Sequence, residues 1–193
     1  MHTPTTITVT LTALTAFALT GCGPTEAVTT KPDTKVSTPT TGTSSSAPAP
    51  SAPSKAATVG DTVTLKGKGD GEQLAVTIKK WVDPAEAAEE FMKPDAGKRW
   101  VAAQFELVNT GTAVYSDSPS NGTQVADDQG QQFHSTFGEI TAGPAMTSSA
   151  KVSPGSKVLG WITYEVPKDS KITKVQFTMN SGFASQTGEW TIP

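Results

Sequence analysis

Apolar and polar residues alternate with a period of two through most of the chain after residue 58. The clearest runs cover residues 62–65, 74–78, 101–107, 160–166, 175–179 and 190–192. Successive side chains of a strand point to opposite faces, so this alternation predicts strands with one buried and one wet face. Turn-forming residues separate the runs, for example Asn109-Thr110-Gly111 and Asp128-Gln129-Gly130. The pattern predicts an all-β fold, an antiparallel β-sandwich.

One segment departs from this alternation and is expected to form a short helix over residues 83–92. Asp83 can cap its N-terminus, and Pro84 suits the first helical position. Glu86 stands three residues after the cap, and Pro94 ends the segment. The expected fold is therefore a sandwich with one short helix.

Composition divides the chain into three parts, which we assign to residues 1–21, 22–57 and 58–193. The last part carries all four tryptophans, both tyrosines and six of the seven phenylalanines, which suits one domain with a core of its own. Of the 35 residues from 23 to 57, 26 are Thr, Ser, Pro or Ala. Such a segment buries too little apolar surface to offset the entropy of ordering, so we expect a disordered linker.

The N-terminal part is expected to be an export signal that ends at the sole cysteine, Cys22. Its apolar run, residues 7–19, would reach about 20 Å as a helix, against a hydrocarbon core of about 30 Å, so it is too short to span a bilayer. The run ends in Leu19-Thr20-Gly21-Cys22, which resembles the lipobox of bacterial lipoproteins. That resemblance implies cleavage after Gly21 and attachment of a diacylglyceryl group to Cys22. The alternative is an ordinary signal peptide with an incidental cysteine.

The lipobox resemblance also implies a location. The membrane would be a partner through the lipid anchor, and the domain would lie on the outer face of the cytoplasmic membrane and project into the cell wall. The residues before the apolar run include no Lys or Arg, which export signals normally have. This leaves open whether Met1 is the true start.

Several classes of function are disfavoured by what residues 58–193 contain. With 12 basic and 16 acidic residues, this part has no excess of positive charge for a nucleic acid. Its single histidine, His134, and its lack of cysteine do not make a zinc site. No Gly-x-Ser-x-Gly motif is present. We therefore predict no catalytic residues, no metal and no cofactor.

A calcium site is the alternative metal site, because calcium takes oxygen ligands from loops. Asp127 and Asp128 are adjacent, and Asp117 and Ser118 precede them. Their spacing matches no calcium-loop signature, so we expect the aspartates to solvate a hairpin tip.

The positions of the tryptophans give the candidate ligand-binding residues, Trp100 and Trp161. By strand parity Trp100 shares the wet face with Glu106, and Trp161 shares it with Glu165, whereas Trp190 falls on the apolar face. Exposed tryptophans can stack on sugar rings or anchor a protein partner. An envelope glycan or an exported protein is the partner that this reading predicts.

A structural role for these tryptophans is the alternative, and we favour it over a binding patch. Lys80 falls on the inward parity of its strand, so a bulge there would turn Trp81 into the core. Trp161 could be covered by the predicted helix or by a loop. Burial of both Trp100 and Trp161 would exclude the exposed patch.

An ordered series of landmarks resembles the immunoglobulin-like domain-of-unknown-function family of actinobacterial and firmicute lipoproteins. The series includes Val59-Gly60-Asp61-Thr62, Val82-Asp83-Pro84, Gly97-Lys98-Arg99-Trp100-Val101, Asn109-Thr110-Gly111, Asp128-Gln129-Gly130-Gln131, Ser153-Pro154-Gly155 and the segment from Gly160 to Pro167. The resemblance implies an immunoglobulin-like β-sandwich and an extracytoplasmic location, with no catalytic residues. Its fold is related to that of a secreted mycobacterial antigen of the immunoprotective extracellular type.

Two functions follow from these observations. The first is a membrane-anchored extracytoplasmic lipoprotein whose β-sandwich is a non-enzymatic binding module of the cell envelope. The second is a passive structural or accessory envelope lipoprotein without its own ligand. An enzyme would need clustered titratable groups in a concave site, which the scattered charges do not suggest.

Overall fold

The computed structural model describes residues 56–193, which form eleven strands and one short 3-10 helix. The elements in chain order are β1 (Ala57–Thr58), β2 (Thr62–Lys66), β3 (Gln73–Val82), β4 (Lys98–Asn109), β5 (Tyr115–Asp117), η1 (Pro119–Gly122), β6 (Thr123–Asp127), β7 (Gln132–Thr136), β8 (Ala150–Val152), β9 (Lys157–Pro167), β10 (Ile172–Thr178) and β11 (Thr187–Thr191).

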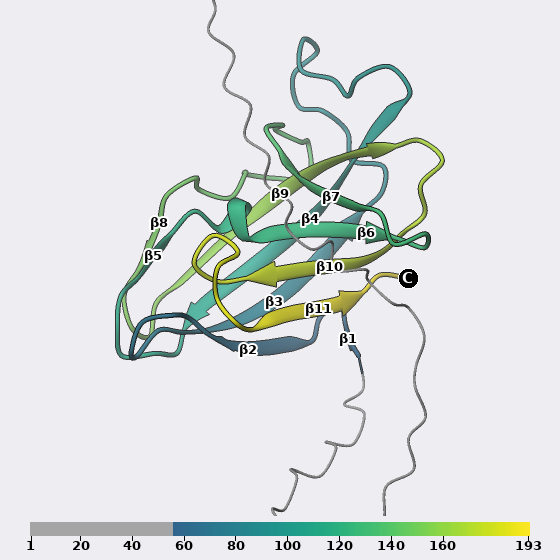
Figure 1. Cartoon of the computed structure of the whole chain (residues 1–193). Coiled ribbons are helices and arrows are strands. Elements are labelled where there is room, and N and C mark those ends of the chain that lie inside the picture. Colours follow the sequence, from purple (N-terminus) through teal and green to yellow (C-terminus); the bar gives the residue numbers. More distant parts are fainter. Residues whose placement is uncertain (1–55) are drawn as a thin grey trace, which may run out of the picture. The chain divides into compact units, whose positions relative to one another are not determined.

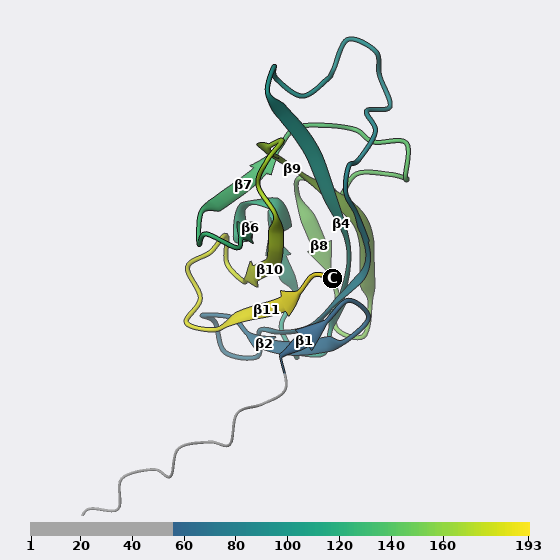
Figure 2. The ribbon, with the colours of Figure 1, turned by 90° about the vertical axis from the view of Figure 1, so that its right-hand side faces the viewer.

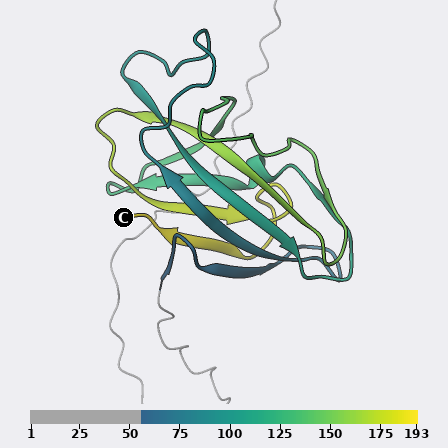
Figure 3. The same cartoon turned by 180° about the vertical axis from the view of Figure 1, so that it is seen from behind.

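Nine of the strands follow one hydrogen-bonded order, β1-β11-β10-β6-β7-β9-β4-β3-β2, which folds into two facing layers (Figures 1 and 2). Strands β2, β3, β4 and β9 form one layer, seen from outside in Figure 3, and β11, β10 and β6 form the other. Strand β7 pairs with both β6 and β9 and so joins the layers. The predicted all-β sandwich is confirmed. Every pairing is antiparallel except that of β1 with β11.

The main core lies between the layers and holds the residues that the period-two pattern placed inward. The rings of Phe105 on β4 and Phe177 on β10 lie 5.9 Å apart between centroids. Trp190 is fully buried, as its parity predicted, and its indole nitrogen donates to the Asp61 carbonyl at 3.0 Å. Four of the six predicted runs lie within strands, and the runs 175–179 and 190–192 each extend one residue past the end of β10 and β11.

A β-bulge interrupts β3 at the position that the alternative for Trp81 required. The register against β4 shifts between Ile78 and Lys80, so no residue of β4 is paired with Lys79 in the strand register. Beyond this shift Lys80 is exposed and Trp81 packs against the main core. The bulge therefore lets a strand with two consecutive lysines keep its tryptophan inside.

The helix predicted over residues 83–92 is wrong, because neighbouring segments take its backbone groups. The Ala85 amide donates to the Trp100 carbonyl at 2.7 Å, and the Ala88 amide donates to the Glu139 carbonyl at 2.9 Å. Ala87 forms an isolated bridge with Ile140. The segment is an irregular loop that ends in a turn, in which the Met92 amide donates to the Glu89 carbonyl at 3.2 Å. Among the described residues the helical turn is η1, which the sequence pattern did not predict.

The predicted signal peptide, Cys22 and nearly all of the predicted linker lie outside the described residues. Ala57, at the end of that linker, is already paired with Trp190. Between residues 56 and 193, no helix has the length and apolar character needed to cross a membrane.

Candidate functional site

A second apolar cluster lies on the outer face of the β4–β9 layer, opposite the main core. Trp100 and Trp161 do occupy this face, as parity predicted, but each is only 3% exposed. Their burial agrees with the structural role that we favoured and excludes the alternative, an exposed ligand-binding patch formed by Trp100 and Trp161. Loops cover this end of the sheet, and the cluster consists of Ala85, Trp100, Ala102, Ile140 and Trp161, with Val82, Ala87 and Met92 packed against it.

The first covering loop, residues 83–97, is tied to the sheet by Arg99. The guanidinium donates through Nε and Nη2 to the two carboxylate oxygens of Asp83, at 2.7 and 2.8 Å. It also donates to the carbonyls of Pro167, Lys168 and Ser170. The planar fork of arginine suits such a set of acceptors. Asp83, expected to cap a helix, instead anchors the start of this loop to β4.

The second covering loop, residues 137–149, lies on the two tryptophans through glycines. A Cβ at Gly138 would stand 2.8 Å from Cη2 of Trp100, and one at Gly143 would stand 2.9 Å from Nε1 of Trp161. On β9, Gly160 has no side chain to keep the Met146 backbone away. Small residues on both sides thus allow loop and sheet to meet closely.

Hydrogen bonds hold the second loop along β9. The Trp161 amide donates to the Pro144 carbonyl at 3.0 Å, and the Met146 amide donates to the Trp161 carbonyl at 2.7 Å. The Thr163 hydroxyl donates to the Gly138 carbonyl at 2.9 Å. Within the described residues, the buried indole nitrogen of Trp161 has no hydrogen-bond partner.

The Trp100 indole reaches a charged group instead. Its Nε1 donates to Glu165 at 3.3 Å, and Lys98 donates to the other oxygen of the same carboxylate at 2.7 Å. The hydrogen bond from Lys98 is the main reason that the pKa of Glu165 lies below its ordinary value.

Between the second loop, β7, β9 and η1 lies an apolar pocket of about 450 Å³, within the range of ligand sites. Phe137 belongs to its lining and is 91% exposed. We call this site the Phe137 pocket. Its lining comprises Met92, Ser120, Asn121, Ser135, Thr136, Phe137, Gly138, Glu139, Ala145, Met146, Ser148, Trp161, Ile162 and Thr163.

The described lining of the Phe137 pocket contains one acidic side chain, Glu139, and no other charged side chain. The Thr141 amide donates to the Glu86 carbonyl at 3.0 Å, and the Ala88 amide donates to the Glu139 carbonyl at 2.9 Å, so the backbones of the two loops run side by side here. Glu89 and Glu90 follow in the first loop, where Lys93 lies 3.8 Å from Glu90. A ligand with positive charge next to an apolar group fits this rim.

The sequence-predicted site residues are separated by the structure. Trp161 lines the edge of the Phe137 pocket, whereas Trp100 lies under Gly138 and does not line it. The sequence pattern did not identify Phe137 as a site residue, because the alternation of strand β7 ends at Thr136 and Phe137 lies in the loop that follows. The signal in the sequence was the pair Gly138 and Gly143, because a side chain at either position would collide with the tryptophans of the sheet.

Asp127, one of the aspartates considered as calcium ligands, has a structural role. Asp127 is buried, and its carboxylate accepts the amides of Gln129 and Gln131, so it stabilises the hairpin. Among residues 56–193, no group of three or more potential ligands could hold a metal. His134 is exposed on β7, as expected for a solvated side chain.

These features define a β-sandwich domain with one outer face roofed by two loops. The chain belongs to the family described as Domain of unknown function (DUF4352), whose profile matches residues 57–188. That description assigns no activity. The resemblance seen in the sequence is thereby confirmed.

Several bacterial proteins of known structure are similar to the chain. The secreted protein MPT63 of Mycobacterium tuberculosis is 15% identical with a TM-score of 0.50, over 73% of this chain and 99% of that chain. The Bacillus subtilis protein yjhA is 14% identical with a TM-score of 0.48, over 70% and 97%. The lipoprotein-assigned ycdA of Bacillus subtilis is 13% identical with a TM-score of 0.49, over 66% of this chain, which spans only 38% of ycdA. No curated protein matches the chain.

Proposed function

We propose that this chain is a lipid-anchored extracytoplasmic protein whose β-sandwich is a non-enzymatic interaction module, and that the Phe137 pocket is its binding site. The observation that carries the proposal is an apolar pocket of about 450 Å³ with a phenylalanine 91% exposed in its lining. Large apolar side chains beside a concave apolar site mark places where a partner is bound.

The pocket is built before any partner arrives. The hydrogen bonds along β9 and the close contacts of Gly138 and Gly143 hold its loop on the second apolar cluster. Little conformational entropy is then lost at the site on binding, which favours affinity. Trp100 supports the site from beneath Gly138, and Trp161 lines its edge.

The partner is an exported protein that inserts an apolar side chain flanked by Lys or Arg. The apolar lining accepts the anchor residue, and Glu139 attracts a basic flank. A catalytic role has no support here, since the lining as described lacks histidine and lysine, and its one charged group is Glu139.

A random peptide display selection tests this partner chemistry. Peptides are selected on the wild-type protein, and the binding of each is then measured on Ser148→Trp, which puts an indole on an exposed residue of the lining. Ser149→Trp is the matched control, because Ser149 is exposed but outside the lining. We expect peptides with one aromatic or aliphatic anchor beside basic residues, bound equally by the control. Peptides that bind Ser148→Trp as well as the wild type would contradict the proposal and favour the passive envelope protein.

The anchor is supported by the lipobox-like Leu19-Thr20-Gly21-Cys22 run. Two or three acyl chains give stable membrane attachment. Cells fed a radiolabelled fatty acid should label the wild-type protein in the membrane fraction, whereas Cys22→Ser should be unlabelled and released from it. Labelling of the Cys22→Ser protein would refute the anchor and leave the pocket proposal intact.

A further inference from the structure

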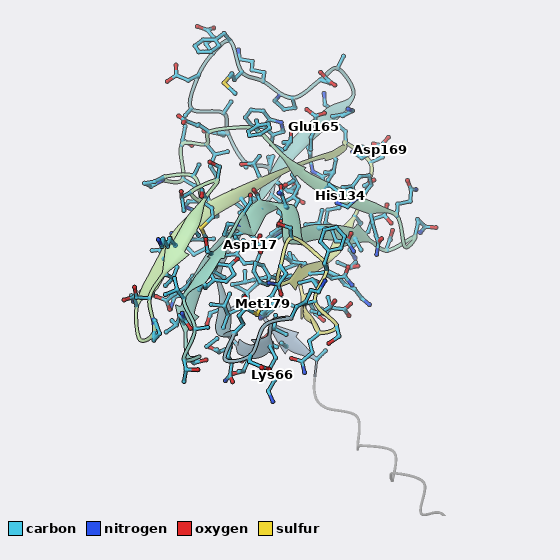
Figure 4. The ribbon with its side chains drawn as sticks, turned by 60° about the vertical axis from the view of Figure 1, so that its left-hand side comes forward. Lys66, Asp117, His134, Glu165, Asp169 and Met179 are labelled. Carbon is cyan, nitrogen blue, oxygen red and sulfur yellow. The ribbon has the colours of Figure 1, made fainter. Side chains whose placement is uncertain are left out.

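A row of polar side chains crosses the outer face of the other layer, away from the Phe137 pocket. The register places Glu189 of β11 opposite Gln176 of β10, Gln176 opposite Gln124 of β6, and Gln124 opposite His134 of β7. Four strands thus present one continuous line of side chains to solvent. Figure 4 shows His134 on this side of the molecule.

A polar groove of about 460 Å³ runs over this row. Gly122 belongs to its lining, and a Cβ there would collide with the Thr178 carbonyl. The groove shares only Asn121 with the Phe137 pocket. Apart from His134 its described lining holds no ionisable side chain, and the groups over the sheet are Gln124, Gln132, His134, Gln176, Thr178 and Thr187.

The amides in this groove have a fixed orientation, which follows from Glu189. Lys174 lies 2.9 Å from one oxygen of that carboxylate, and the pKa of Glu189 is lowered chiefly by this contact. The ionised carboxylate only accepts, so Gln176 must donate to it through Nε2, at 2.9 Å. The Gln176 Oε1 then accepts Nε2 of Gln124 at 2.6 Å. This relay leaves the Gln124 carbonyl as an acceptor for something else.

One end of the groove is a rigid wall. Asn180 and Ser181 both have φ of 53°, a left-handed conformation that costs free energy for residues other than glycine. Asp117 holds Ser181 by accepting its amide at 2.8 Å and its hydroxyl. Asn180 accepts the Lys68 amide at 2.8 Å and donates to Glu72 at 3.0 Å. The strained turn is thus over-determined by neighbouring loops, and Ser181 is presented to the groove in one position.

We infer that this groove binds a neutral polyhydroxylated ligand, an oligosaccharide. A sugar hydroxyl both donates and accepts, as do the fixed amides and threonine hydroxyls of the lining. A charged ligand would find no opposite charge there, since Lys174 is already paired with Glu189. A peptide strand would find no free backbone edge, because β6 and β10 are paired on both sides.

Nuclear magnetic resonance titration of the isotope-labelled protein tests this inference. The probes are chitotetraose, cellotetraose, mannotetraose and maltotetraose, each at about 10 mM, which saturates a site of millimolar affinity. We expect at least one to shift the side-chain amide signals of Gln124 and Gln176. The double variant Gln124→Ala/Gln176→Ala should bind it at least about tenfold more weakly, since two hydrogen bonds are lost. Gln129→Ala, an exposed glutamine outside the groove, is the control and should bind as the wild type does.

Two results would overturn the inference. One is the absence of groove shifts with all four saccharides, and the other is unchanged binding by the double variant. Thermal unfolding of each variant shows whether it is folded, and Gln124→Leu offers a second substitution if the double variant is not. Ser148→Trp should bind the saccharide normally, which separates this groove from the Phe137 pocket.

Discussion

Gly138 lies against the face of Trp100 so closely that an added Cβ would stand 2.8 Å from Cη2 and 3.0 Å from two further ring carbons. This contact joins the second loop to the outer face of β4. It explains why a tryptophan on the solvent side of a strand is only 3% exposed. Through it, the stability of the second apolar cluster and the shape of the Phe137 pocket depend on each other.

Gly138→Ala should therefore destabilise the domain by about 1–3 kcal/mol, the usual cost of overpacking. Urea unfolding measures this. In a Trp100→Phe background, which lacks the ring atoms nearest the new methyl group, the cost of Gly138→Ala should shrink to below about 1 kcal/mol. An equal cost in both backgrounds would show that the methyl group does not meet Trp100.

The two buried tryptophans Trp161 and Trp190 should respond differently to replacement by phenylalanine. Trp190 donates to the Asp61 carbonyl, whereas the indole nitrogen of Trp161 has no described partner. Both substitutions lose packing, but only Trp190→Phe loses a hydrogen bond. We expect Trp190→Phe to be the more destabilising by about 1 kcal/mol in urea unfolding. The opposite order would mean that Trp161 is bonded in solution.

Arg99→Ala should cost about 2 kcal/mol, because it removes a two-pronged ion pair with Asp83 and three bonds to carbonyls. Arg99→Lys keeps the charge but not the fork, so its cost should be intermediate. Proteolysis of the loop over residues 83–97 should accelerate in the same order. A lysine variant as stable and as resistant as the wild type would contradict the role given to the fork.

Acid should weaken the domain through its bonded glutamates. Hydrogen bonds lower the pKa of Glu165 mainly through Lys98, of Glu72 through Asn180, of Glu106 through Lys157 and of Glu189 through Lys174. The unfolded chain then binds more protons in this range, so stability rises with pH. The stability that these glutamates contribute is fully present above the ordinary glutamate pKa of 4.5, and it is lost as the pH falls through their lowered pKa values.

Glu165→Gln tests the contribution of Glu165 to this acid sensitivity, and Lys98→Met removes the hydrogen bond that lowers the pKa of Glu165. Both should flatten the dependence of urea stability on pH below about 4.5. A slope in that range equal to the wild-type slope in both variants would show that the ion pair does not form in solution.

The β-sandwich could be predicted from the sequence because its strands have one buried face and one face toward solvent. Phe105, Phe177 and Trp190 were placed inward by parity alone, and the structure buries them. Parity also placed Trp100 on the correct outer face. It could not show that this face is covered, since the cover comes from loops that lack a period. The helix expected from Asp83 does not form, because tertiary partners such as Arg99 outweigh local capping preferences.

The candidate sites were less predictable. Phe137 lies in a loop, and it becomes part of a pocket only together with residues distant in sequence, such as Trp161 and Ile162 of β9. The row of Gln176, Gln124 and His134 comes from strands whose register is set by pairing across 52 and then 10 positions of sequence. No local pattern contains that information, because β6 and β7 carry short, weakly alternating segments.

Site-specific photo-crosslinking in intact cells tests the central claim that the Phe137 pocket binds an exported protein. A photoreactive phenylalanine at position 137 should give one discrete crosslinked species, absent when the same residue stands at Val114, which is 44% exposed and outside the lining. Ser148→Trp should abolish that species and Ser149→Trp should not. A species that survives Ser148→Trp, or no species at all from position 137, would contradict the account.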